Sequence, residues 1–281
     1  MRRCIWLELK KNLYLPYVLL VVFGVLFFGL AAPAGKNGSG KEIAIFFMML
    51  KEDLKMEAGI EGSGLVLWSQ GMSGWLMVFL PFLLTCGYIF VFSSERQDKY
   101  LQFLRIRCGN LRFCCAKIIG GALSGGLTFA LGYAVFGILM SACFPSFSGF
   151  PPEEQGIYTG IWGAEPVWYV ARRLAGSFFY GAGSCVFGIG VAILLRDRYM
   201  LLCLPFLLNY CWSQMLNKLV ISDIAYREGA YNRLIQAFDP SSLLNMPWDR
   251  YWLLQLVMLL AVYIGFVFLF CRLMERGYYD G

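Results

Sequence analysis

The sequence contains no histidine, and only 15% of its 281 residues are charged. Histidine is the commonest metal ligand and the usual acid or base near neutral pH. Its absence excludes Ser-His and Cys-His nucleophiles and the HExxH zinc helix. Charged residues make up about a quarter of an average soluble protein, so the low charge content also argues against a soluble or disordered chain.

Hydrophobic residues make up 59% of the chain and gather in long runs without Asp, Glu, Lys or Arg. A helix needs about 20 apolar residues to cross the hydrocarbon core of a bilayer. Six segments meet this need and predict membrane-spanning helices near 13–32, 73–93, 117–143, 172–195, 199–217 and 251–271. Lipid offers no partner to unpaired backbone groups, and the runs lack the alternation of a barrel strand. We therefore expect an all-α integral membrane protein with one transmembrane domain over 1–281.

The basic residues predict the orientation of this domain. Of the 24 lysines and arginines, 14 lie in the short segments 1–12, 93–117, 196–198 and 271–281. The positive-inside rule then places these segments and both termini in the cytoplasm of a multi-pass cell-membrane protein. The outer loops are 33–72, 144–171 and 218–250. Basic residues beside the spans are explained by topology and anionic lipid, so we expect no nucleic-acid partner.

The N-terminal segment resembles a signal peptide, because Arg2 and Arg3 precede an apolar stretch. That stretch is too long for a signal sequence, and Glu8 lies before it. Apolar residues instead recur at helical spacing among the basic ones. This pattern predicts an amphipathic helix over 2–12, lying on the inner membrane surface.

Neither a metal nor a nucleotide site is predicted. Of the ten cysteines, Cys4, Cys108, Cys114 and Cys115 lie in inner segments and the others in or near spans. No pair lies in an oxidising outer loop, so we expect no disulfide framework, and Cys114 and Cys115 lack the spacing of a zinc site. Residues 35–41 match GxxxxGK, but Glu42 replaces the Ser or Thr that binds magnesium, and no strand precedes the motif.

The predicted span cores lack charged residues, whereas ion-driven carriers and voltage sensors place such residues at membrane depth. If the protein transports a substrate, another polypeptide must supply the energy. Small residues such as Gly121, Gly125, Ser184 and Gly188 are expected to let helices pack closely.

The inner loop after the second predicted span favours a short amphipathic helix over 95–107. Tyr100, Phe103, Leu104 and Arg107 share one face of this helix. Such a helix can bind in the groove of a partner protein, or it can rest in the lipid headgroups. The pattern alone leaves both interpretations open.

The arrangement of six spans, an N-terminal inner helix, a helix led by Glu95 after the second span and a tight turn over 194–199 resembles the permease subunits of type-two ATP-binding-cassette exporters. Glu95 and Lys117 match positions where this family tends to place an acid and a lysine. Asp98 and Lys99 replace the usual Gly-Thr pair, and the usual proline is absent from 105–112.

The resemblance implies a non-catalytic half-transporter that works with a second permease subunit, the same or homologous, and with cytoplasmic ATP-binding-cassette ATPases. No cofactor is bound by this chain, and ATP and Mg are expected in the ATPase. The docking residues would be an apolar group, Tyr100, Phe103 and Leu104, surrounded by Glu95, Lys99, Arg105 and Arg107.

The uncharged, aromatic-rich spans favour an amphiphilic peptide, a lipid or a hydrophobic drug as substrate, because buried polar cargo needs positioned polar partners. The resembled family includes exporters that confer resistance to antimicrobial peptides. The alternative hypothesis is a non-transport scaffold or sensor subunit of a membrane complex, and a membrane enzyme or secondary carrier is a third.

Two outer loops carry candidate substrate or gate residues. Phe46, Phe47 and Leu50 lie on an apolar stripe that rests on the outer leaflet, caps the bundle or meets a substrate or partner. Tyr231 and Phe238 lie on a second amphipathic stripe, where a gate or plain packing both fit.

Overall fold

The computed structural model is a helical bundle with one small β-hairpin. It describes residues 2–36, 42–53, 59–72, 74–97, 108–151, 155, 166–195, 197–227, 231–236, 238–239, 243–244 and 250–276. The long helices are α1 (Arg2–Asn12), α2 (Leu15–Leu30), α6 (Trp75–Gln97), α8 (Asn110–Cys143), α10 (Pro166–Leu194), α11 (Arg198–Arg227) and α13 (Arg250–Glu275). The shorter ones are α3 (Ile45–Leu50), α5 (Gly64–Gln70), α12 (Asn232–Gln236) and the 3₁₀ turns η1 (Gly59–Gly62) and η2 (Phe147–Gly149).

In the described part of the chain, four helices, α6, α8, α10 and α13, are long and apolar enough to cross a membrane. The bent pair of α1 and α2 provides a fifth candidate. The structure therefore confirms a helical protein with several helices of membrane-spanning length. The remaining predicted span, 199–217, is helical in α11, but this helix does not pass the same test among the described residues. The count of six spans and the orientation remain predictions.

The predicted boundaries differ most at three helices. α8 begins seven residues before 117, and α10 begins six residues before 172. α11 continues ten residues beyond 217. The extensions of α8 and α11 are of mixed polarity, and Arg172 and Arg173 separate the apolar start of α10 from the rest of its apolar run. The hydropathy of a span therefore does not reveal these extensions, although the backbone hydrogen bonding continues through them.

The N-terminal helix predicted over 2–12 is present as α1 and meets α2 at an angle of 61°. Pro16 explains why one helix does not continue into the next. Its ring cannot donate a backbone hydrogen bond and would clash with the carbonyl of Asn12, the last residue of α1. Pro16 suits the first turn of α2 instead, where the backbone N–H groups have no helical partner.

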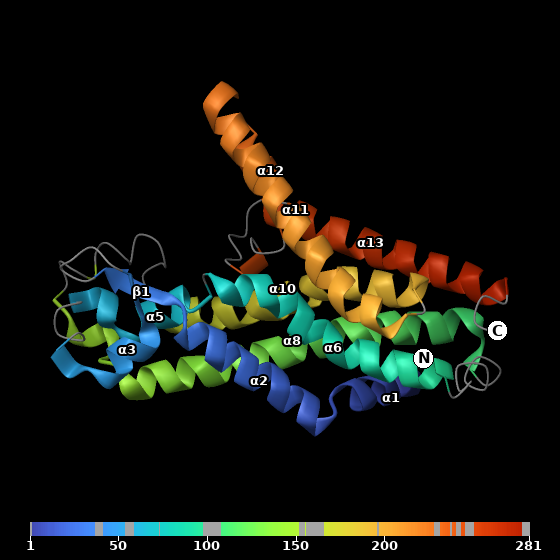
Figure 1. The fold of residues 1–281 in the computed structure, drawn as a ribbon, viewed down its shortest axis with the longest axis horizontal. Helices are drawn as coiled ribbons and strands as arrows, with labels where there is room; N and C mark the ends of the chain where they lie inside the picture. The colour runs from blue at the N-terminus through green and yellow to red at the C-terminus, as the bar shows by residue number, and fades with distance from the viewer. Residues whose placement is uncertain are drawn as a thin grey trace.

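The two ends of the bundle differ in what they carry (Figure 1). The start of α1 and the end of α13 lie at the same end, near the labels N and C. The hairpin of β1 (Pro33–Lys36) and β2 (Glu42–Ala44) lies at the other end with α3 and α5. Its antiparallel register sets Pro33 opposite Ala44 and Lys36 opposite Glu42. This hairpin was not predicted and adds a small β element to the all-α expectation.

Helix α8 is the centre of the packing and contacts α1, α2, α5, α10 and α13. Small residues allow the closest approaches, as predicted. A side chain at Gly125 would overlap Cys185 of α10, and one at Gly188 would overlap Thr85 of α6. Large apolar side chains remain exposed along the outside of the bundle, among them Phe23, Phe27, Ile138, Leu260 and Phe268. An outer surface of this kind suits contact with lipid.

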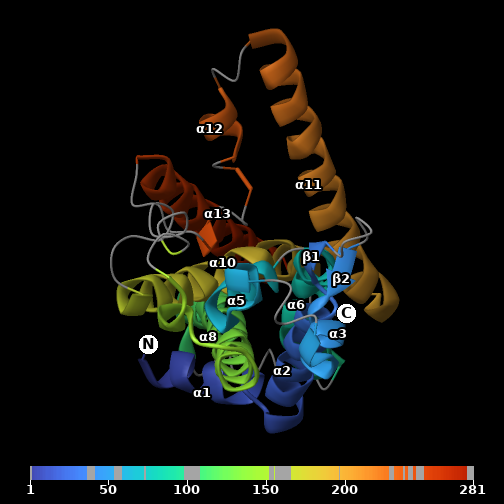
Figure 2. The same cartoon turned by 90° about the vertical axis from the view of Figure 1, so that its left-hand side faces the viewer.

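Helix α11 packs against the bundle at its N-terminal end and projects from it at its C-terminal end (Figures 1 and 2). It contacts α6 and α10, whereas its far end projects away beside α12. An apolar cavity of about 300 Å³ lies between α10, α11 and α13. Phe187 of α10, Trp212 of α11 and Met258 of α13 line it.

Candidate functional site

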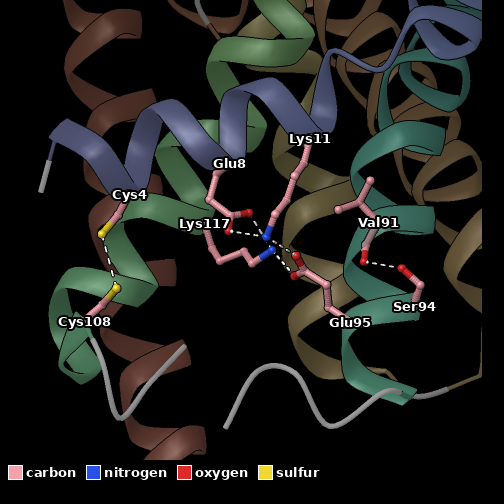
Figure 3. A network of polar contacts seen from close by, with 8 residues as sticks. All are labelled: Cys4, Glu8, Lys11, Val91, Ser94, Glu95, Cys108 and Lys117. Carbon is pink, nitrogen blue, oxygen red and sulfur yellow. Dashed lines mark hydrogen bonds and ion pairs between the residues drawn. The ribbon is translucent and has the colours of Figure 1, made fainter. Parts of the chain in front are cut away.

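A cluster of four charged side chains joins three helices at the end of the bundle where α1 begins and α13 ends (Figure 3). Glu8 and Lys11 come from α1, Glu95 from the end of α6, and Lys117 from α8. The Lys117 Nζ lies 2.6 Å from Glu8 Oε2 and also contacts Glu95 Oε2. The Lys11 Nζ lies 2.9 Å from Glu95 Oε1 and 3.6 Å from Glu8 Oε1. Each lysine thus contacts both carboxylates.

Three of these side chains are almost fully buried. The exposed fraction is 1% for Lys117, 5% for Glu8 and 9% for Glu95, whereas Lys11 is 33% exposed. Burying an isolated charge costs several kcal/mol, and removing one partner of a buried pair typically costs about 3–5 kcal/mol. The cluster balances two positive against two negative charges, so each buried charge has a close partner. It therefore makes the relative position of α1, α6 and α8 specific.

The helical spacing of α1 brings its contributing residues to one face. Glu8 and Lys11 are three residues apart, and Cys4 precedes Glu8 by four, so the three side chains point the same way. Gly120 of α8 allows this face to approach, because an added Cβ there would lie 2.9 Å from Glu8 Cβ. The glycine lies almost one turn after Lys117, beside the ion cluster.

A pair of cysteines lies next to the cluster. The Cys4 Sγ of α1 is 3.3 Å from the Sγ of Cys108, which lies just before α8 (Figure 3). The hydrogen bond to Cys4 raises the pKa of the Cys108 thiol above its ordinary value, and partial burial adds to this effect. All ten cysteines of the chain have free thiols.

Further contacts hold the same end of the bundle together. Arg96 donates a hydrogen bond of 2.6 Å to the carbonyl of Leu195, directly after α10. A basic side chain is favourable at a helix C-terminus, where carbonyls lack helical partners. The amide of Asn110, at the start of α8, donates to the carbonyl of Cys271 in α13 at 3.4 Å.

The predicted docking residues divide into two groups. Glu95 is not on the surface of a docking helix, because it is buried against Lys11 and Lys117. The other six lie outside the described residues: Lys99, Tyr100, Phe103, Leu104, Arg105 and Arg107. The structure describes the chain up to Gln97 and again from Cys108 onward. Segment 98–107 is therefore preceded by the part of α6 that carries Glu95 and followed by Cys108 of the cysteine pair.

The candidate substrate or gate residues of the two predicted outer loops are exposed. Phe46, Phe47 and Leu50 of α3 face outward, while Ile45 and Met48 of the same helix are buried. Tyr231 and Phe238 are also exposed, and Phe238 lines the cavity beneath α11. The carbonyl of Phe238 accepts a hydrogen bond of 3.1 Å from the Trp212 indole.

One buried charged residue, Arg173, lies farther inside its helix than expected. Arg173 was expected at the start of a span, but α10 begins at Pro166, so Arg173 lies about two turns inside the helix. Its Nε donates to the Tyr133 hydroxyl at 3.3 Å, and its Nη2 donates to the carbonyl of Ser69 at 3.3 Å. The ring of Tyr133 stacks on Trp68 with centroids 4.5 Å apart. These polar contacts compensate the burial of the guanidinium.

A second cavity is lined in part by Trp68. It has a volume of about 490 Å³ and is lined mostly by apolar side chains of α5, α8 and α10, with serines near η2. Among the described residues, no group of three or more Cys, Asp or Glu side chains is placed to bind a metal ion.

Sequence reasoning found Glu95 and Lys117 as positions of interest but not their shared partners on α1. The available signal was the spacing of Cys4, Glu8 and Lys11, which places one acid and one base on the same helical face.

No family model matches the sequence, and no curated protein sequence matches it significantly.

Proposed function

We propose that this protein is the membrane-spanning permease subunit of an ATP-driven exporter, powered by a separate cytoplasmic ATP-binding-cassette ATPase. Four or five helices long enough to cross a membrane support a membrane role. The observation that carries the proposal is the ion cluster at the two flanks of segment 98–107. Glu95 lies three residues before this segment, and Lys117 lies in the first turns of the helix that follows it.

This geometry suits a coupling element. A force applied to segment 98–107 by a partner reaches α6 through its C-terminal end and α8 through its N-terminal end. Because Glu8 and Lys11 bind both of these ends, α1 moves with them. Closure of two ATPases would then favour one arrangement of the permease helices over another, which is allosteric coupling between separate chains.

The proposed cargo is amphiphilic. The long helices are lined and surrounded by apolar and aromatic side chains, and an amphiphilic peptide, a lipid or a hydrophobic drug requires few positioned polar partners. The permease subunit would pair with a second copy or a homologue to enclose the path. The candidates for contact with cargo are the exposed residues of the two outer loops: Phe46, Phe47, Leu50, Tyr231 and Phe238.

The test is recovery of the ATPase with a docking variant. The tagged chain is solubilised from its native membranes in mild detergent, and the retained proteins are identified and quantified by mass spectrometry. The double substitution Phe103→Asp and Leu104→Asp introduces charge into the apolar docking face and should abolish recovery of an ATP-binding-cassette ATPase. Equal recovery with this variant would overturn the docking role.

The control variant also replaces two apolar side chains by aspartate, but at the opposite end of the bundle. The double substitution Phe46→Asp and Phe47→Asp changes two exposed aromatic residues of α3 and should leave ATPase recovery unchanged. An efflux assay on the docking variant distinguishes a permease from a scaffold. A scaffold would tolerate the docking substitutions without loss of export, whereas a permease would not.

A further inference from the structure

The thiols of Cys4 and Cys108 are in direct contact although 104 residues separate them in the sequence. Their Sγ atoms are 3.3 Å apart, and a disulfide requires an approach to about 2.0 Å. Both residues are partly exposed, unlike the buried Cys86, Cys114 and Cys185. A small reagent can therefore reach this pair.

The backbone beside Cys108 has room to make the small movement. Gly109 has a φ of +78°, and no atom lies within 4 Å of the position that a Cβ would take there. Glycine adopts this conformation without strain. Cys4 lies in the first turn of α1, where the backbone N–H groups have no hydrogen-bond partner within the helix. Glu8 and Lys11 lie in the turns that follow.

We propose that Cys4 and Cys108 form a reversible disulfide when this end of the bundle meets a low-molecular-weight disulfide oxidant of the glutathione class. The thiolate of one cysteine attacks the oxidant, so a mixed disulfide forms and one small thiolate leaves. The second cysteine then attacks the protein sulfur of the mixed disulfide and releases the second small thiolate. The two cysteine protons end on the two released thiols, and the two electrons reduce the oxidant.

The disulfide and the existing ion pair would together attach α1 to both flanks of segment 98–107. Lys11 already holds Glu95 before the segment, and the disulfide would hold Cys108 directly after it. Oxidation would thereby fix the segment's ends to one helix. The dithiol chemistry does not depend on the proposed transport function, because it requires only the contact between the two sulfurs.

Trypsin makes the product easy to identify. Cleavage after Arg3 and Lys10 releases residues 4–10, and cleavage after Arg107 and Arg112 releases residues 108–112. Each peptide contains one cysteine. A disulfide between them has a unique mass and disappears on reduction.

The experiment treats the full chain in mild detergent with oxidised glutathione, blocks the remaining thiols with N-ethylmaleimide and quantifies the linked peptides by mass spectrometry. We expect the 4–10 to 108–112 product in the wild-type protein, its loss in Cys4→Ser and Cys108→Ser, and its retention in Cys115→Ser. The proposal is overturned if the folded wild-type protein gives no such product. It is also overturned if chain denatured in SDS gives the same yield, because the reaction would then not depend on the folded contact.

Discussion

Lys117 of α8 lies 2.6 Å from Glu8 of α1, so an ion pair buried from solvent joins residues 109 positions apart in the sequence. The side chain of Lys117 is 1% exposed and also contacts Glu95. This relationship makes the N-terminal helix an integral part of the bundle rather than an appendage on its surface. The expectation of a helix resting in the headgroups is therefore incomplete, because one of its faces is buried against α8.

Substitution of Lys117 tests the energetic role of the cluster. Lys117→Met leaves Glu8 and Glu95 with Lys11 alone, and loss of a buried partner should destabilise the protein by about 3–5 kcal/mol. The midpoint of thermal unfolding in detergent should fall by roughly 10 °C. Lys10→Met is the control, because Lys10 is exposed on the same helix α1. Equal midpoints for the two variants would contradict a structural role for the cluster.

Removing a second charge should recover part of that loss. In the Lys117→Met background, Glu95→Gln removes a carboxylate that has lost its closest partner, so the double variant should unfold at a higher temperature than Lys117→Met alone. The matched change Glu52→Gln, at an exposed position, should give no recovery. Additive destabilisation by Lys117→Met and Glu95→Gln would show that the two side chains do not interact.

Gly120 provides a steric test of the same contact. A valine at this position would press on Glu8 and move α1 away from α8, since even a Cβ lies 2.9 Å from Glu8 Cβ. Gly120→Val should reduce the yield of the disulfide between Cys4 and Cys108 and lower the unfolding temperature. Gly265→Val in α13 is the control, because no atom lies within 4 Å of its added Cβ. A wild-type disulfide yield in Gly120→Val would show that α1 does not depend on this close approach.

Cysteine reactivity should report the hydrogen bond between the two thiols. The bond to Cys4 is the largest cause of the raised pKa of Cys108, with smaller contributions from burial and from the charge of Glu8, partly offset by the positive N-terminus of the chain. A raised pKa leaves less thiolate at any pH below it. Cys4→Ala should lower the pKa of Cys108 and speed its reaction with maleimide between about pH 7 and 9.

The rate is followed on the tryptic peptide 108–112, whose single cysteine is Cys108. Cys143→Ala serves as the reference variant, because that residue lies at the other end of α8. A slower or unchanged rate in Cys4→Ala would contradict the assigned cause of the shift.

The buried arginine predicts a stability effect far from the ion cluster. Tyr133→Phe removes the hydroxyl that accepts from Arg173 and that donates to the carbonyl of Trp68. A buried donor without its partner typically costs about 1–3 kcal/mol, so the unfolding temperature should fall. Tyr210→Phe, at an exposed tyrosine of α11, should have little effect. Equal midpoints would show that the hydroxyl does not support Arg173.

Much of the fold follows from the placement of apolar residues. The runs that lack charge correspond to α2, α6, α8, α10, α11 and α13, because backbone hydrogen bonding and apolar side chains favour a helix wherever such a run is long enough. The boundaries were less predictable. Arg173 was expected at the start of a span, yet α10 begins before it, and Tyr133 and the Ser69 carbonyl satisfy its guanidinium within the helix.

The candidate site was only partly predictable. Glu95 and Lys117 were identified from a resemblance, but a single sequence does not indicate that Glu8 lies beside Lys117, since that contact depends on how α1 folds back along α8. The β-hairpin was missed because Pro33–Lys36 and Glu42–Ala44 are too short for a period of two to emerge. The contact of Cys4 with Cys108 is likewise a product of tertiary packing.

The most direct measurement is the identity and amount of the proteins that remain bound to the wild-type chain in mild detergent. A permease subunit should retain an ATP-binding-cassette ATPase in an equimolar amount, and the purified complex should hydrolyse ATP. Purification of the folded chain from its native membranes without any such ATPase would contradict the proposed function.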